Sequence, residues 1–554
     1  MMKFKPFSMN ASTLALLCAV YIVPADNRYF WGSLFKIIDI STWGGISFSL
    51  GIFAILVGIF SIIFLTFSAR VIFKPVLIFI LVLSAVVSYF QTEYGVIIDK
   101  SMIQNVVETD YKEATELVSF SLLFHLAIFG LLPALAVGFA PVRYRTFMKE
   151  SAIRMLSILG AVLLVSLLIW ANYKDFALIG RGHRELRLFV NPTAPLFEAY
   201  KFARNKFFYS KAGPIQPIGL DARQNGRYLQ VSHKDNKKTV VVFVVGETAR
   251  AKSFSLNGYS RETNPQLAKD DVINFKNAHA CGTSTAESLP CIFSHFDRVD
   301  YSSKNAGQYE NVLDVLSRAG VHVLWRDNNS GCKGVCERVG MEDVSGLSVP
   351  ELCSSKECFD EILLHQLQDR IHQAKADTLI VLHQKGSHGP AYYKRYPKTF
   401  AAFTPECTDN APQNCKREAL LNAYDNTILY TDYFLHKTIE FLRSNSEKYN
   451  SVMIYASDHG ESLGENGIYL HGLPYVLAPD EQRRIPMIVW LSDGYSASYQ
   501  LSRECLSKQQ DRPVSHDNIA HSLLGLFGVE TTLYKQGHDI FQTCMAGNKN
   551  TSNP

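Results

Sequence analysis

Three consecutive hydroxyl side chains, Thr283, Ser284 and Thr285, lie between two cysteines in the segment ACGTSTAESLPC at residues 280–291. A serine or threonine hydroxyl can act as a nucleophile, but it is barely ionised at neutral pH and must be activated by a base or a metal ion. The alternative interpretation is an ordinary polar loop. The segment by itself does not choose among the three hydroxyls, so the choice depends on what else converges near them.

Acidic and histidine residues follow several short apolar runs beyond residue 238. Glu247 ends TVVVFVVGE, Asp458 and His459 follow SVMIYAS, and His388 lies in KGSHGP just after DTLIVLHQ. His471, in YLHGLPY, is close enough in sequence to return to the same place. Singly, such residues are more often helix caps or structural histidines than ligands. Together they supply the oxygen and nitrogen donors that a catalytic divalent metal prefers, which favours a metal site.

A metal ion at this place would activate a hydroxyl of the 280–291 loop. Zinc with three protein ligands keeps a fourth position open and lowers the pKa of the group that occupies it. A hydroxyl of the 280–291 loop at that position would become a nucleophile. The sequence therefore predicts one catalytic site, built from the residues at the ends of the runs and from this loop.

The apolar runs are the elements that must bring these residues together. They are continuous rather than alternating, which is typical of strands buried on both faces of a largely parallel sheet. In an open α/β sheet, ligands bind beyond the carboxyl ends of the strands. We expect an α/β doubly wound domain over residues 239–545, followed by a disordered tail at 546–554. The expected strands are 239–247, 321–327, 377–384, 451–458 and 485–492.

The first third of the chain has a different character. Its apolar runs mostly match the roughly 20 residues that cross a bilayer core, so we expect a transmembrane domain of five helices over residues 1–173. A cleaved signal peptide is disfavoured, because small residues of a cleavage site are not evident and another apolar run follows closely. The expected spans are 11–23, 46–67, 71–90, 117–140 and 153–173.

Basic residues flank these spans on alternate sides, which predicts an orientation by the positive-inside rule. An N-terminus in the cytoplasm and five crossings would place the chain beyond about residue 174 outside the cytoplasm. Residues 174–238 are then a linker, either a plain one or one with amphipathic segments that lie on the membrane surface. The basic residues are Lys3, Lys5, Arg70, Lys74, Arg143, Arg145 and Lys149.

Cysteine usage agrees with an oxidising compartment. Cys18 lies in the first apolar run, whereas the other ten of the eleven cysteines all follow residue 280. Their close spacing favours disulfides over zinc knuckles, which usually need a second matching C-x-x-C pair, although sequence cannot prove the connectivity. The net charge of +4 implies no polyanion partner, and we expect no nucleic-acid binding. The expected pairs are Cys281/Cys291, Cys332/Cys336, Cys353/Cys358 and Cys407/Cys415, with Cys505/Cys544 as a longer-range candidate.

The motifs GETAR, CGTSTAESLPC, GSHGP and SDHGESLGENGIYLHG, preceded by five spans, resemble the lipid A phosphoethanolamine transferases of Gram-negative inner membranes. This family includes enzymes that confer polymyxin resistance. The resemblance covers nearly the whole chain. It implies an alkaline-phosphatase/sulfatase-like catalytic domain in the periplasm that uses zinc. It also implies transfer of phosphoethanolamine from phosphatidylethanolamine to a phosphate of lipid A through a covalent phosphothreonine, by a protein that we expect to be a monomer.

The resemblance assigns roles to single residues. Thr285 becomes the nucleophile among the three hydroxyls. His388 and His471 match two further histidines that hold the transferred phosphate or a second zinc ion, and Lys333, in GCKGVC, matches a lysine that contacts the substrate. The implied ligands of the first zinc ion are Glu247, Thr285, Asp458 and His459.

A polar stripe near the membrane also matches the family. Asn105, Thr109 and Glu113 recur every four residues, so on one helix they would share a face. By itself such a stripe is more typical of a solvated surface. The resemblance implies instead that these residues contact the ethanolamine headgroup, with Glu113 facing its ammonium group.

Two other classes of protein must be weighed. The nearest rival is a membrane-bound phosphoglycerol transferase or a sulfatase-like hydrolase on the same fold, but a sulfatase normally needs Cys or Ser where this loop offers Thr285. A non-catalytic transporter or sensor is disfavoured, because ionisable residues within the spans are sparse apart from His125 and the chain keeps all implied ligands.

Overall fold

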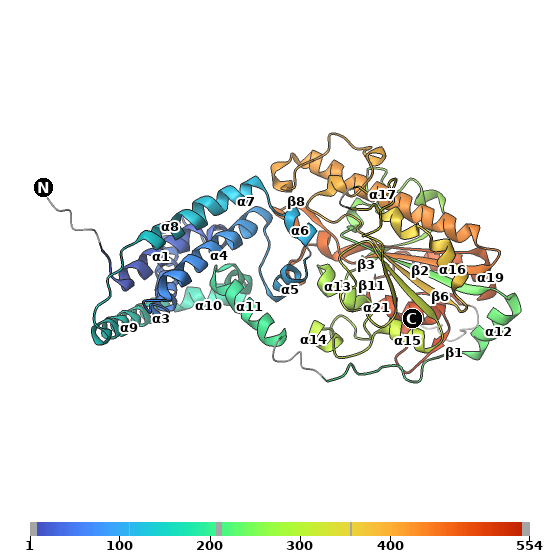
Figure 1. Ribbon diagram of the computed structural model, residues 1–554, viewed down its shortest axis with the longest axis horizontal. Coiled ribbons are helices and arrows are strands. Elements are labelled where there is room, and N and C mark those ends of the chain that lie inside the picture. The colour runs from blue at the N-terminus through green and yellow to red at the C-terminus, as the bar shows by residue number, and fades with distance from the viewer. Residues whose placement is uncertain (1–7, 110, 207–212, 355–356, 546–554) are drawn as a thin grey trace. The chain divides into compact units, whose positions relative to one another are not determined.

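The computed structural model describes residues 8–109, 111–206, 213–354 and 357–545, without the side chains of residues 112 and 113 (Figure 1). Lys3, Lys5 and the tail predicted at 546–554 lie outside the described residues. The chain divides into two compact units. The first unit comprises Met1–Ile103 and Val118–Phe202, and the second comprises Gln104–Leu117 and Ala203–Pro554.

The first unit consists of apolar helices. Four helical segments in the described residues are long and apolar enough to cross a membrane: α3 (Trp43–Thr66), α4 (Phe73–Tyr94), Phe120–Phe139 and α9 (Phe147–Ala171). The third of these is built from three consecutive elements, α7 (Phe120–His125), the π-helical turn η1 (Leu126–Leu131) and α8 (Leu132–Phe139). The first predicted span forms α1 (Ala11–Ala25), a shorter apolar helix of 15 residues. All five apolar runs are therefore helical, and four of them have the length of a membrane span.

The surface of α9 has the composition that a lipid environment requires. Its 18-residue apolar window has no buried residue, and Leu156, Leu163 and Trp170 are 68%, 62% and 79% exposed. Exposing so many large apolar side chains to water would cost roughly 1.5–3 kcal/mol for each one, whereas lipid tails are as apolar as leucine.

Part of the predicted linker folds into the first unit. It forms α10 (Tyr173–Gly182), η2 (Arg184–Phe189) and α11 (Thr193–Arg204). Asn191 is fully buried, and its amide nitrogen donates hydrogen bonds to the carbonyl oxygens of Asp26 (3.0 Å) and Ser84 (2.7 Å). Because buried polar groups need such partners, these bonds fix the segment to the helices. Contact of the linker with a membrane surface stays a prediction.

A sheet forms the centre of the second unit (Figure 1). It has eight strands in the order β11-β3-β10-β7-β2-β6-β4-β5. All five predicted strands belong to it. The strands are β2 (Lys238–Gly246), β3 (Ile273–His279), β4 (His322–Asp327), β5 (Gly340–Asp343), β6 (Thr378–His383), β7 (Tyr449–Ser457), β10 (Arg484–Leu491) and β11 (Val514–Ser515).

The sheet is largely parallel, as predicted, with one exception. Strands β7, β2, β6 and β4 run parallel to one another, but β10 pairs antiparallel with both β7 and β3. A continuous apolar run predicts burial on both faces of a sheet and carries no information about direction. Strand β3 was not predicted, because its second half, KNAH, is polar.

Apolar cores cover both faces of the sheet. Val241, Phe243 and Val245 of β2 pack into one core with residues of α15 (Val312–Arg318) and α21 (Asp517–Leu526). The alternate side chains Val240, Val242 and Val244 pack into a second core with α16 (Leu367–Gln373) and α17 (Arg417–Ser444). Because successive residues of a strand point to opposite faces, this is the doubly wound α/β arrangement that the sequence predicts.

Five disulfides join the ten cysteines that follow residue 280. They connect Cys281 with Cys291, Cys332 with Cys336, Cys353 with Cys358, Cys407 with Cys415, and Cys505 with Cys544. Cys18, in α1, is a buried free thiol. The pairs are those that sequence spacing favours.

Candidate active site

Two neighbouring parallel strands, β2 and β7, bring three of the predicted ligands together. Glu247 directly follows β2, and Asp458 and His459 directly follow β7. All three side chains are fully buried, with their donor atoms within 4.8 Å of one another. Nε2 of His459 lies 3.2 Å from Asp458 Oδ2 and 3.5 Å from Glu247 Oε1.

Thr285 is the hydroxyl residue that faces this cluster. It is the first residue of α13 (Thr285–Ile292), and its Oγ1 lies 3.1 Å from Glu247 Oε2 and 3.4 Å from His459 Nε2. Thr283 instead donates its hydroxyl to the carbonyl oxygen of Leu473 at 2.6 Å. The geometry therefore separates the three hydroxyls that the sequence left equivalent, and it places Thr285 at a helix N-terminus, where backbone N–H groups attract anions.

Several contacts fix the backbone that carries Thr285. The Cys281–Cys291 disulfide joins the residues before α13 to its last turn. The backbone N–H of Cys281 donates to Nδ1 of His516 at 3.0 Å, and Nε2 of His516 lies 2.9 Å from the carbonyl oxygen of Ser457. A Cβ atom at Gly282 would lie 2.9 Å from the Cβ of Glu287, so the turn before Thr285 needs glycine. The loop is thus held to the end of β7.

The backbone around Glu247 is also constrained. Thr248 adopts a left-handed conformation with φ of 58°, which costs about 1–3 kcal/mol for a non-glycine residue and occurs mainly at functional sites. In this conformation its hydroxyl donates to Glu247 Oε1, and its backbone N–H donates to Asp458 Oδ1 at 3.1 Å. Gly386 has φ of 54°, and a Cβ there would lie 2.6 Å from the carbonyl oxygen of Glu247.

A buried polar chain orients Glu247 from the other side. The amide nitrogen of Asn329 donates to Glu247 Oε2 at 2.7 Å and to the carbonyl oxygen of Gln384 at 2.9 Å, and it lies 3.3 Å from His383 Nε2. Nδ1 of His383 in turn lies 2.8 Å from Asp327 Oδ2. Burial opposes ionisation of Asp327, but the charge of His383 and its hydrogen bonds outweigh burial and lower the pKa of Asp327 to about 2.

The pKa values of the two buried carboxyl groups, Glu247 and Asp458, are shifted in opposite directions. Burial raises the pKa of Glu247, but attraction to the protonated forms of nearby histidines, His459 first, and the hydrogen bond from the Thr248 hydroxyl outweigh burial and hold this pKa well below its usual value. Burial and the charge of Glu247 raise the pKa of Asp458 well above its usual value. Burial and the charge of His471 lower the pKa of His459 to about 3, so this ring is neutral at physiological pH.

These residues fit a divalent metal ion. Asp458 Oδ1 accepts two backbone N–H bonds, whereas the buried Asp458 Oδ2 accepts no hydrogen bond from the described residues. A buried carboxylate oxygen without a donor is costly unless a cation binds it. Carboxylate oxygens and imidazole nitrogens are also ligand types that zinc uses in proteins. Glu247, Asp458 and His459, with Thr285 beside them, can therefore hold a metal.

His388 and His471 lie near this centre. The ring of His471 packs 4.3 Å from the ring of His459 and 5.8 Å from that of His388, measured between centroids. Nδ1 of His471 lies 2.8 Å from Oε2 of Glu461. Burial lowers the pKa of His471, but the charge and hydrogen bond of Glu461 outweigh it and raise the value to about 9. A protonated His471 could pair with a phosphate oxygen.

Lys333 lies in the Cys332–Cys336 loop and has φ of 49°. Its ammonium group donates to the hydroxyl of Ser330 at 3.1 Å and to the carbonyl oxygen of Glu108 at 3.4 Å. It lines a cavity of about 550 Å³ together with Glu108, Arg338 and other polar residues. A single lysine beside such a cavity can contact an anionic headgroup.

The polar stripe does not share one helix face as predicted. Helix α5 (Lys100–Glu108) ends before Thr109, and α6 (Tyr111–Glu116) is a separate helix. The hydroxyl of Thr109 donates to the carbonyl oxygen of Asn105 at 2.7 Å, next to the end of α5. The side chain of Glu113 lies outside the described residues. A four-residue spacing is compatible with a helix but does not show where the helix ends.

Sequence reasoning missed several residues that support the site. No sequence pattern marks Asn329 as a site residue, because it lies in a loop two residues beyond a strand. Asp327 and His383 end two adjacent strands and face each other in register, so the strand-end rule could have found them. Glu461, which holds His471, lies within the motif SDHGES.

The order of the sheet, and the hydroxyl and metal-type ligands at its carboxyl edge, define an alkaline-phosphatase/sulfatase-like domain, and residues 239–529 match the Sulfatase family. Residues 56–207 match a second family, described as phosphoethanolamine transferase EptA/EptB. The chain belongs to the phosphoethanolamine transferase family, because its similarity to members of that family extends over nearly its whole length.

Three comparisons support this assignment. The chain is 40% identical to the phosphoethanolamine transferase EptA of Escherichia coli (strain K12) over 539 residues, which cover 97% of each chain. It is 39% identical to the phosphatidylethanolamine transferase Mcr-1 of Escherichia coli, covering 94% of this chain and 96% of that protein. The structure of the integral membrane protein lipooligosaccharide phosphoethanolamine transferase A (EptA) from Neisseria meningitidis matches with a TM-score of 0.92 at 34% identity, covering 97% of this chain and 100% of that chain.

Proposed function

We propose that the protein transfers phosphoethanolamine from phosphatidylethanolamine to a phosphate group of lipid A, through a covalent intermediate on Thr285. Membership of the transferase family supports the transferred group. The names of two relatives support a phosphatidylethanolamine donor and a lipooligosaccharide acceptor. The observation that carries the mechanism is the position of Thr285 Oγ1, 3.1 Å from Glu247 Oε2 at the start of α13.

In the first step, Thr285 Oγ1 attacks the phosphorus of the donor. The bond between phosphorus and the diacylglycerol oxygen breaks, the bond from phosphorus to Thr285 Oγ1 forms, and diacylglycerol leaves with a proton. Glu247, beside Oγ1, orients the hydroxyl and can accept its hydrogen bond. The backbone N–H groups at the start of α13 and a protonated His471 offset negative charge on the phosphate oxygens.

The residues that would hold zinc are Glu247, Thr285, Asp458 and His459. When bound, zinc supplies a positive charge that lowers the pKa of the hydroxyl and offsets charge on the phosphate oxygens. A second zinc ion near His388 and His471 is part of the proposal as an alternative to direct phosphate binding by these two histidines, whose rings lie 5.8 Å apart.

In the second step, an oxygen of a lipid A phosphate attacks the phosphorus of phosphothreonine. The bond to Thr285 Oγ1 breaks and the threonine side chain is regenerated with a proton. The product keeps the lipid A phosphate, which loses its second ionisable oxygen on esterification, and the ammonium group offsets the negative charge of the added phosphate. Such a product lowers the negative charge of the outer membrane and weakens the binding of cationic polymyxins. Lys333 and the polar residues Asn105, Thr109 and Glu113 are proposed to contact the donor headgroup.

We place the protein in the bacterial inner membrane as a monomer with five spans, a cytoplasmic N-terminus and a periplasmic catalytic domain. Four long apolar helices support the membrane location. Five disulfides in the second unit suit an oxidising compartment. Two lipid substrates would explain why a catalytic α/β domain is joined to these helices.

The proposal is tested by mass spectrometry of lipid A from cells that express the wild type, Thr285→Ala or the matched control Ser284→Ala. We expect added phosphoethanolamine with the wild type and the control, and none with Thr285→Ala. Modification by Thr285→Ala equal to the wild type would exclude Thr285 as the nucleophile. An added glycerol phosphate would instead assign the phosphoglycerol transferase class, and unmodified lipid A in all strains would exclude it as the acceptor.

A further inference from the structure

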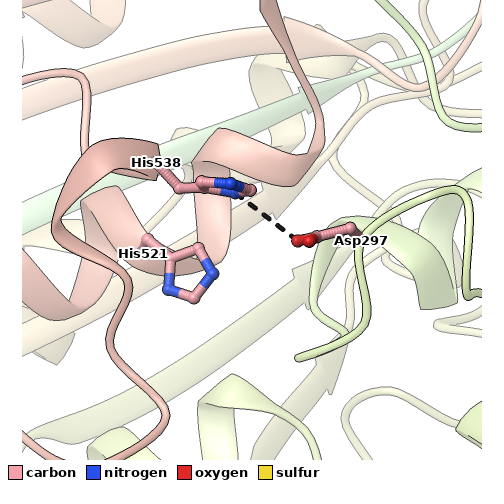
Figure 2. A group of neighbouring side chains, drawn as sticks. All are labelled: Asp297, His521 and His538. Atoms are coloured by element: carbon pink, nitrogen blue, oxygen red, sulfur yellow. Dashed lines mark ion pairs between the residues drawn. The ribbon is translucent and has the colours of Figure 1, made fainter.

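A second group of metal-type ligands lies outside the active site. Asp297 lies in the loop that follows α13, His521 is on α21, and His538 ends the 3₁₀ turn η11 (Gln536–His538) (Figure 2). One ligand atom of each residue lies within 4.8 Å of the other two. Among the described residues, this group and the active-site cluster are the two that have such geometry. We propose that Asp297, His521 and His538 bind a divalent transition-metal ion, of which Zn²⁺ is the ion best matched to these ligands.

The types of ligand atom in this group indicate which metal ion would bind. Two imidazole nitrogens and one carboxylate oxygen suit zinc and similar ions, and leave at least one position for water. Calcium and magnesium prefer oxygen ligands, which makes them poor candidates. The three residues come from separate segments of the chain, so no single turn or helix accounts for their convergence.

One imidazole nitrogen of this group has no hydrogen-bond partner among the described residues. Nδ1 of His538 is buried and makes no hydrogen bond within the described part of the chain, although it lies 3.4 Å from Asp297 Oδ1. The rings of His521 and His538 are perpendicular, with centroids 5.2 Å apart (Figure 2). Buried polar atoms normally have a partner, and a cation between these side chains would provide one.

The burial of His521 agrees with a ligand held inside the protein. This side chain is only 3% exposed, and one of its ring nitrogens lies within 4.8 Å of a ligand atom of each of the other two residues.

Lys535 would compete with the metal. Its ammonium group lies 2.7 Å from Asp297 Oδ2, which leaves Oδ1 facing His538. Its backbone N–H donates to Nδ1 of His521 at 3.3 Å, and ligation through that nitrogen would replace this long hydrogen bond. A nearby positive charge disfavours a bound cation, so removing the charge of Lys535 should strengthen metal binding.

The site would act on structure rather than in the reaction itself. It would join the loop after α13, which begins at the nucleophile Thr285, to α21 and the C-terminal segment. The neighbouring Arg298 already connects these parts, because its backbone N–H donates to Asp517 Oδ1 and its Nε donates to the carbonyl oxygen of Cys281, both at 2.9 Å. A metal at Asp297 would reinforce this connection and stabilise the nucleophile loop.

The test measures metal content and stability of the purified full-length protein. Protein stripped with a chelator is reloaded with zinc, freed of excess ion and analysed for zinc per chain by mass spectrometry. We expect His521→Ala and Asp297→Asn each to lose one equivalent relative to the wild type. His322→Ala, which removes an exposed histidine from β4, should lose none. Asp458→Asn should lose zinc from the active site and keep the equivalent bound here, which separates this inference from the proposed function.

Two further measurements protect the test against misfolding. Zinc should raise the melting temperature of the wild type more than that of Asp297→Asn, whose residue is only half-buried and tolerates substitution. Lys535→Met should bind zinc with a lower Kd than the wild type, which a purely structural loss cannot produce. Equal zinc content, equal zinc-induced stabilisation and an unchanged Kd across these variants would overturn the proposal.

Discussion

Arg395 forms a buried ion pair with Glu116 of helix α6. The side chains are only 1% and 8% exposed, and a second guanidinium nitrogen of Arg395 lies 2.5 Å from Glu357 Oε2. Nε of Arg395 donates to the carbonyl oxygen of His388 at 2.7 Å. Arg395 therefore connects α6, which follows the proposed headgroup residues Asn105 and Thr109, to the loop that carries His388.

Breaking this pair from either side should weaken catalysis. Removing one partner of a buried ion pair typically costs about 3–5 kcal/mol, because the other charge is left unpaired. We expect Glu116→Gln and Arg395→Gln each to reduce transfer at least about tenfold, with the double variant losing much less than the product of the two. Transfer rates of the wild type, the two single variants and the double variant, measured in detergent, give the coupling energy.

As a control, Lys398→Gln breaks the more exposed pair with Glu406 and should leave the rate unchanged. Fully independent effects of Glu116 and Arg395 would contradict this account.

Asn329 should contribute to catalysis through Glu247. A hydrogen bond to a charged group is worth about 1.5–3 kcal/mol, so Asn329→Ala should lower kcat roughly 10- to 100-fold. Asn329→Asp should lower it further, because it adds a third carboxylate beside Glu247 and Asp458. The exposed Asn414→Ala serves as the control. An Asn329→Ala enzyme with wild-type kcat would show that Glu247 needs no such orientation.

The active site could be predicted to the extent that it follows from strand ends. Glu247, Asp458 and His459 end two strands that are parallel neighbours, so burial patterns and the position of the polar residues were sufficient. Asn329 was missed because the path of a loop depends on tertiary contacts. The hydroxyls 283–285 were equivalent by chemistry. The family resemblance pointed to Thr285, and the hydrogen bonds of the structure distinguish it from Thr283.

The fold, like the site, could be predicted only in part from the sequence. Apolar runs predicted five strands and five apolar helices, four of which are long enough to cross a membrane, because burial leaves a clear pattern in sequence. The antiparallel direction of β10 and the polar strand β3 are set by pairing with neighbours, which no local pattern records. The break between α5 and α6 was likewise invisible to a four-residue spacing.

His516 should make stability depend on pH. Burial lowers the pKa of this histidine to about 4 from an ordinary value of 6.5. Between these two pH values the unfolded chain binds a proton that the folded chain excludes, so stability is fully present above pH 6.5 and falls as the pH drops toward 4. The loss amounts to about 3 kcal/mol at most. Thermal unfolding between pH 7 and pH 4 should show a smaller loss for His516→Gln than for the wild type. Identical pH profiles would contradict the role given to His516.

The Cys281–Cys291 disulfide should hold the nucleophile in place. Closing a loop of this length stabilises a protein by about 3 kcal/mol. We expect the double variant Cys281→Ser/Cys291→Ser to lose transfer activity at temperatures where the membrane helices remain folded by circular dichroism. The matched control, Cys407→Ser/Cys415→Ser, removes a disulfide with a similar sequence separation, 8 residues against 10, and should keep more activity. Equal losses in the two double variants would assign the first disulfide only a general stabilising role.

The central claim is that Thr285 carries the transferred group. Purified enzyme is incubated with phosphatidylethanolamine in the absence of lipid A, quenched in acid and digested, and the peptide that contains residues 283–285 is sequenced by mass spectrometry. We predict one added phosphoethanolamine on Thr285, lost when lipid A is supplied before quenching and absent from Thr285→Ala. A modification on Thr283 or Ser284, or an unmodified peptide from an enzyme that still transfers phosphoethanolamine, would contradict the account.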